Sequence, residues 1–145
     1  LGFTFDENED GSLVAGEAIT YGFSSALDAD LNGVVDVATA PLSRNLGTAT
    51  GIGGGGFQAI AEDFQAIEFN YILSDGTATT APAANQLDDI RSVQISLLAR
   101  ARQPDRNFND IATYTTASGA VWGPFNDRFR RRFQVMTIHL RNMVM

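Results

Sequence analysis

The residues best suited to chemistry are acidic side chains near the start of the chain, spaced like the ligands of a calcium loop. Residues 6–17 match a twelve-residue pattern whose oxygens at positions 1, 3, 5, 7 and 12 surround the ion, with a glycine at position 6 for the sharp turn. The ligands would be Asp6, Asn8, Asp10, the backbone carbonyl of Ser12, and Glu17. This spacing predicts a first calcium site.

A second acidic loop repeats much of this spacing. Its ligands would be Asp28, Asp30, Asn32, the backbone carbonyl of Val34, and Asp36. The twelfth position is Thr39, so a carboxylate from elsewhere would have to complete the site. Neither loop looks flanked by two amphipathic helices, so we expect calcium loops grafted onto β-structure. The alternative is a pair of solvated Asp/Asn/Gly turns, which hairpins commonly use.

The other motifs give no support for catalysis. His139 is the only histidine and stands in an apolar run, where a structural role is expected, and no second histidine or nucleophile elbow accompanies it. The glycine run at 51–56 fits a dinucleotide fingerprint formally, but it does not follow a buried strand of a βαβ unit, so we interpret it as a linker. We therefore predict no catalytic residues and no organic cofactor.

Charge is divided unevenly along the chain. Residues 1–90 carry fourteen acidic side chains against Arg44 alone, whereas residues 91–145 carry nine arginines against three aspartates. The sequence pI near 4.4 argues against nucleic acid as a partner. Lysine is absent, which favours planar arginine pairing with carboxylates. The acidic half is therefore expected to be neutralised in one of two ways. It binds cations, or it pairs with arginines of this chain or of neighbouring subunits.

The hydrophobic pattern predicts an α+β, mainly β fold with antiparallel sheet, long loops and at most short helices. Alternation or β-branched content indicates strands within 18–23, 67–73 and 93–100, with a partner strand starting near 41–45. Apolar residues at helical spacing over 57–67 suggest a turn or short helix before the second of these strands. Residues 87–90 resemble a brief helical turn. We expect one globular domain over 1–145.

The last third of the chain combines a long polar stretch with a strongly apolar end. The polar stretch after Pro104 is expected to be functional or packed by its own aromatics, and Trp122 within it either caps the core or forms an exposed contact loop. The arginines at 128–132 either pair with carboxylates, at an intrachain or subunit contact, or form a solvated strand end. From Phe133 onward both alternating faces are apolar, which predicts a buried central strand.

Four segments, in this order, resemble the PilW-like minor pilins of type IV pili. They are residues 17–21 with 42–45, residues 60–71, residues 90–100, and residues 131–142, which carry the arginine-led last strand ending in Leu140-Arg141-Asn142. The resemblance implies a non-enzymatic, β-rich pilin-like head that normally continues an N-terminal apolar helix. No stretch of this chain approaches the roughly 18 apolar residues of a membrane span, so that helix is expected to be missing here.

The resemblance also implies partners and a location. Such subunits are anchored in the inner membrane by the N-terminal helix with the head in the periplasm, and then pass into the pilus or onto the cell surface. The implied partners are other minor pilins and the major pilin, in a complex that initiates the pilus or forms its tip. Two alternatives remain open, which are a related minor pseudopilin of type II secretion and a calcium-dependent adhesive or ligand-binding β module.

Overall fold

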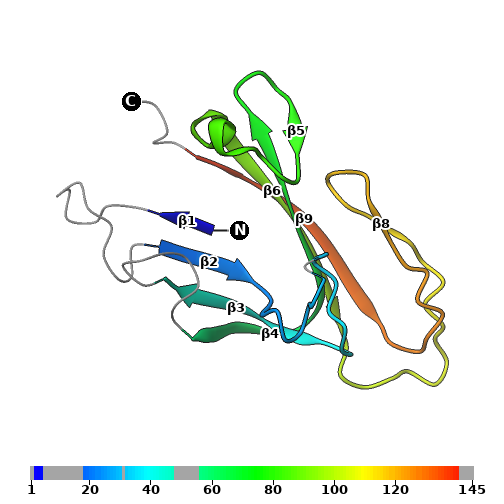
Figure 1. The fold of residues 1–145 in the computed structure, drawn as a ribbon. Coiled ribbons are helices and arrows are strands. Elements are labelled where there is room, and N and C mark those ends of the chain that lie inside the picture. Colours follow the sequence, from blue (N-terminus) through cyan, green and yellow to red (C-terminus); the bar gives the residue numbers. More distant parts are fainter. Residues whose placement is uncertain (1, 5–17, 31, 48–55, 141–145) are drawn as a thin grey trace. The chain divides into compact units, whose positions relative to one another are not determined.

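A computed structural model describes residues 2–4, 18–30, 32–47 and 56–140 of the chain (Figure 1). Contacts divide the chain into two compact units, residues 1–65 and residues 66–145. One long strand, β4 (Phe57–Leu73), runs through the boundary and contributes its first part to one unit and its second part to the other. The prediction of a largely antiparallel, mainly β fold is confirmed.

The first unit consists of antiparallel strands in sequential order. They are β1 (Gly2–Thr4), β2 (Ala18–Gly22), β3 (Ala40–Leu46) and the first part of β4. β2 pairs with β3 in the register Ile19 to Leu46, which confirms the predicted strand pair. Among its described residues, the buried apolar side chains are those of Phe23, Val35 and Ala40.

The predicted helical turn over 57–67 is wrong, because those residues form the first part of β4. Their apolar side chains do not form a buried helical stripe, since Phe57 and Ile60 are 42% and 52% exposed. Pairing with β3 satisfies the backbone instead, and a register shift near Leu42 accommodates Asp63 at a φ of 67°. Long-range strand pairing has overridden a local helical spacing in which Ile67 is buried but Phe57 and Ile60 are not.

The second unit is built around the second part of β4 and four further elements. β5 (Ala78–Thr79) pairs with β4, the 3-10 helix η1 (Ala84–Asp89) confirms the predicted helical turn, and β6 (Ile90–Arg100) leads to β9 (Arg131–His139). The strand order is β4, β6, β9, as Figure 1 shows in green, yellow-green and orange-red. A separate hairpin joins β7 (Tyr114–Thr115) and β8 (Val121–Trp122).

The core of the second unit follows the alternation read from the sequence. Leu73 of β4 packs with Ile90 and Val93 at the start of β6, and Phe69, Tyr71 and Ile95 pack against this group. On β6, Leu98 is fully buried. Because side chains alternate across a strand, Leu98 lies on the face opposite Val93 and Ile95, beside Ser92 and Ser96, which are also buried, so β6 is covered on both faces.

The prediction that β9 is buried in the middle of the sheet is wrong. β9 is the last strand in the order and pairs only with β6 among the described residues. Its apolar side chains remain accessible, with Val135 43% and Ile138 46% exposed. An apolar pattern on both faces of a strand reports side chains that avoid water, and it does not say whether both edges of the strand are paired.

Candidate interaction surface

The segment between β6 and β9 folds back on itself and returns to the start of β9. The backbone N–H of Asp110 donates to the carbonyl of Asp127 at 2.7 Å, and the N–H of Asn126 donates to the carbonyl of Asp110 at 2.8 Å. The N–H of Ala101 donates to the carbonyl of Arg130 at 2.8 Å. These bonds bring carboxylates from the segment to the arginine run at 128–132.

Arg131 is the centre of a buried ion cluster. One guanidinium nitrogen donates to Asp110 Oδ2 at 2.8 Å and to Asp127 Oδ1 at 2.7 Å, and the other donates to Asp127 Oδ2 at 2.7 Å. The side chains of Arg131 and Asp110 are 0% and 1% exposed. The hydroxyl of Tyr114 donates to Asp110 Oδ2 at 2.9 Å. The buried charge of Arg131 is tolerated because both of its partners are carboxylates that accept its hydrogen bonds, and Tyr114 donates a further bond to one of them.

Aromatic rings enclose this cluster. The guanidinium of Arg131 lies 3.9 Å from the ring centroid of Phe125. Phe133 of β9 packs against Tyr114 at 5.8 Å between centroids, and against Trp122 at 6.0 Å in an edge-on geometry. The long polar stretch is therefore packed by its own aromatics. Trp122 caps the sheet through Phe133, which agrees with the first of the two roles predicted for it.

Proton equilibria in the cluster reflect these contacts. The hydrogen bonds from Arg131 hold the pKa of Asp127 below its usual value, although partial burial opposes them. Burial, together with the hydrogen bond to Asp110, raises the pKa of Tyr114 to about 12. Tyr114 therefore stays protonated and keeps donating to Asp110 well above neutral pH.

The other arginines of the run lie at the surface. Arg130 pairs with Asp105 at 2.7 Å, but its side chain is 65% exposed, so the pair is screened by solvent. The hydrogen bond from the backbone N–H of Asn107 holds the pKa of Asp105 below its usual value, and the hydrogen bond from Arg130 adds a smaller effect in the same direction. Arg128 and Arg132 are exposed. The run thus divides into one buried structural arginine and three surface arginines.

Sequence reasoning did not single out Asp110, Asp127 or Tyr114. The available signal was the charge distribution, because residues 91–145 contain only three acidic residues among nine arginines. All three of these aspartates pair with an arginine of the run. The intrachain alternative for the arginine run is therefore confirmed for Arg130 and Arg131.

The first predicted calcium loop, with Asp6, Asn8, Asp10, Ser12 and Glu17, lies outside the described residues. In the second loop the carboxylate of Asp28, 5% exposed, accepts the backbone N–H groups of Asn32 and Gly33 at 3.1 and 3.0 Å. Asp36 accepts the N–H of Ala29 at 2.8 Å. Across the residues that the structure describes, no three His, Cys, Asp or Glu side chains gather into a metal site. The acidic side chains here bind the loop's own backbone.

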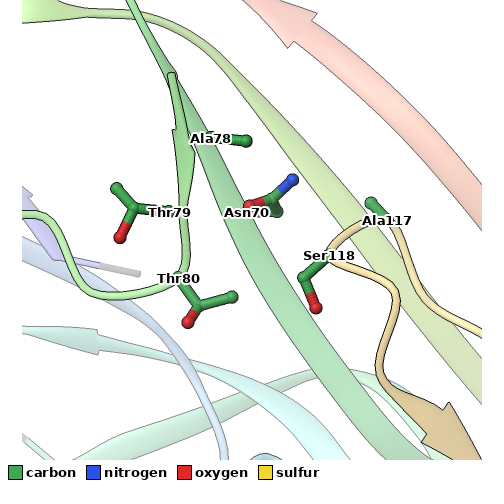
Figure 2. Close-up of a pocket in the computed structure, with 6 residues that line it drawn as sticks. All are labelled: Asn70, Ala78, Thr79, Thr80, Ala117 and Ser118. Atoms are coloured by element: carbon green, nitrogen blue, oxygen red, sulfur yellow. The ribbon is translucent and has the colours of Figure 1, made fainter.

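A pocket of about 420 Å³ lies in the second unit beside β5 and the tip of the β7–β8 hairpin (Figure 2). It is lined by Asn70, Ala78, Thr79, Thr80, Ala117 and Ser118. Glu68 anchors Ser118 by accepting its hydroxyl at 2.8 Å, and Ser96 accepts the N–H of Ala117 at 2.9 Å. No lining residue is titratable, so the pocket offers neutral polar contacts and no acid–base group.

Two further motifs have simple outcomes. His139 ends β9 and is exposed, so it does not fill the structural role expected in an apolar run. Of the glycine run, residues 51–55 lie outside the described part of the chain. Within that part, no helix has the length and apolar character needed to cross a membrane.

Comparisons with known proteins agree with the resemblance noted from the sequence. The family described as type IV pilus-assembly protein W matches residues 19–142, which is most of the chain. No curated protein and no solved structure gives a significant match. The matched region runs from Ile19 of β2 through β9 and includes the whole arginine cluster. The chain belongs to the PilW family of type IV pilus-assembly proteins.

Proposed function

We propose that this chain is the head of a minor pilin, which helps to initiate a type IV pilus or forms part of its tip through protein–protein contacts. Its partners in this proposal are other minor pilins and the major pilin. Its location is the cell envelope, with the head in the periplasm and an N-terminal helix holding the subunit in the inner membrane. The role requires no catalysis.

The observation that carries this proposal is the surface at the start of β9. Arg128, Arg130 and Arg132 are exposed there, on a chain whose first 90 residues are strongly acidic. The exposed apolar side chains of Val135 and Ile138 continue the same strand. A basic rim beside accessible apolar groups is a common composition for a protein interface, since arginine is enriched at such surfaces.

Reversing the three surface arginines tests this role. The variant with Arg128, Arg130 and Arg132 changed to Glu is expected to fold normally and to lose co-purification with the other minor pilins of its filament system, because close like charges repel. A control with Glu at the exposed positions Thr77, Ala78 and Thr80 should retain its partners. Equal association of both variants would contradict the proposed surface. Recovery of secretion pseudopilins as partners would favour the type II secretion alternative.

We also propose that Ca²⁺ stabilises the acidic loops. The support is the ligand spacing at 6–17 and the cluster of carboxylates at 28–36. Calorimetry with Ca²⁺ should detect binding that Glu17→Gln weakens. Asp28→Asn is expected to lower stability even in a chelator, because Asp28 holds two backbone N–H groups. Absence of heat up to millimolar Ca²⁺ would leave both loops as hydrogen-bonded turns.

A further inference from the structure

The outer edge of β9 is a long, regular strand edge that no other described strand covers. The register with β6 is unbroken from Ser92 opposite His139 to Arg100 opposite Arg131. β9 is the terminal strand of the order, and its residues include no proline, glycine or bulge. Prolines and bulges are among the features by which proteins protect a sheet edge. Because β9 has neither, it retains the capacity to pair with a further strand.

The hydrogen-bond pattern identifies which backbone groups face outward. The N–H of Leu140 donates to the carbonyl of Arg91 at 2.9 Å, and the carbonyl of Arg130 accepts the N–H of Ala101 at 2.8 Å. In an antiparallel ladder, residues directed at the partner alternate with residues directed away from it. Even-numbered residues of β9 therefore face β6, whereas the backbone groups of Val135, Thr137 and His139 face the open edge.

The side chains along this edge suit an apolar partner. Val135 and Ile138 are 43% and 46% exposed on opposite faces of the strand, and Leu140 is 36% exposed. A strand added at the edge would cover part of each and would place its own side chains beside them. Such an addition supplies backbone hydrogen bonds for affinity and side-chain contacts for specificity.

Charge decides what kind of strand fits. From residue 128 to the last residue the sequence contains five arginines and no acidic residue. Antiparallel pairing of β9 with β9 of a second copy would place Arg132 of each strand beside the other strand's Ile138 end, which carries no carboxylate to pair with it. A partner strand with Asp or Glu at the end beside Arg130 and Arg132 would instead form opposite-charge pairs.

We propose that the outer edge of β9 binds an extended apolar strand of another pilus subunit, one that carries acidic residues at the end next to Arg130 and Arg132. This inference rests on the proposed function and specifies how the contact is made. The partner strand hydrogen-bonds to the outward backbone groups of Val135, Thr137 and His139. Its apolar side chains cover Val135 and Ile138.

Amide hydrogen exchange tests the binding mode with a defined probe. The probe is a peptide as long as the 9-residue β9, of alternating Val and Thr, with Glu residues at one end. It should slow exchange at Val135, Thr137 and His139 and leave Gln134 and Met136 unchanged, because these already bond to β6. The same peptide ending in Lys should bind about tenfold more weakly. Equal protection by both peptides, or protection that does not alternate, would overturn the proposal.

A pair of substitutions at one position separates the backbone contact from the side chain. Thr137→Pro removes an outward N–H at a position where an edge strand tolerates proline, and should weaken peptide binding about tenfold. Thr137→Ala keeps the N–H and should bind as the parent does. If Thr137→Pro fails to fold, the alternating exchange pattern in the parent still decides the question.

Co-purification with the other minor pilins then distinguishes the two proposals. Loss of partners in Thr137→Pro and in the triple arginine reversal supports both. Loss in the arginine reversal alone retains the proposed function and overturns strand addition. Retention of partners in both variants overturns both. Self-association of the parent that Thr137→Pro abolishes would overturn the choice of a different subunit as the partner.

Discussion

Replacing Arg131 with Met is expected to destabilise the protein by about 3–5 kcal/mol, since removing one partner of a buried ion pair leaves the other charge uncompensated. The uncompensated groups are Asp110, 1% exposed, and Asp127. The loss should also release the segment 101–130, because Arg131 joins both aspartates to the start of β9. Denaturant unfolding measures the first effect and limited proteolysis of the segment measures the second.

The neighbouring arginine provides the matched control for this prediction. Arg132 has the same side chain but is exposed, so Arg132→Met should change stability by no more than about 0.5 kcal/mol. A variant that combines Arg131→Met with Asp110→Leu and Tyr114→Phe removes the buried polar partners together and should recover part of the loss. Similar unfolding curves for the Arg131 and Arg132 single variants would show that the cluster contributes little.

Truncating Leu98 to Ala is expected to cost about 2–5 kcal/mol, the usual range for a buried Leu when the surrounding core does not collapse. Leu98 is fully buried on β6 and stands opposite Phe133 of β9 in the register. Phe133 in turn packs against Tyr114 and Trp122, so a cavity at Leu98 weakens the support under the aromatic cluster. The free energy of unfolding, with near-ultraviolet circular dichroism as a report on these rings, measures the effect.

Ile111 supplies the control for Leu98. It is an aliphatic residue of the same size but is 72% exposed, so Ile111→Ala creates no cavity. Its free energy of unfolding should lie within about 0.5 kcal/mol of the parent's. A cost below about 1 kcal/mol for Leu98→Ala would contradict the assignment of Leu98 to the core of the second unit.

These two effects also guide the assembly experiments. A variant at Arg131 is expected to lose partners because the segment 101–130 loosens, whereas a variant at Arg128, Arg130 or Arg132 changes the surface and leaves that segment in place. Stability should therefore be measured beside co-purification for every arginine variant. Only a loss of partners at unchanged stability supports direct contact.

Fold class, several strands and family membership follow from the order of the residues alone. Strict alternation in 67–73 indicates the second part of β4, because a period of two matches the pleat of a strand, and the apolar, β-branched run in 93–100 indicates β6. The resemblance in segments that end with the arginine-led strand agrees with the family match over 19–142. Local pattern was sufficient wherever one face of a strand meets the core.

Three other features depend on how the chain folds back on itself. Strand pairing with β3 converted the helically spaced residues 57–67 into strand, and the edge position of β9 exposed side chains that the pattern had placed in the interior. It also divided the arginine run, burying Arg131 between Asp110 and Asp127 while its neighbours stayed at the surface. The physical reason is common to all three. A sequence records which side chains avoid water, but whether a backbone edge is paired, or a charge is buried, depends on segments distant in the chain, as when Asp110 joins Asp127 at Arg131.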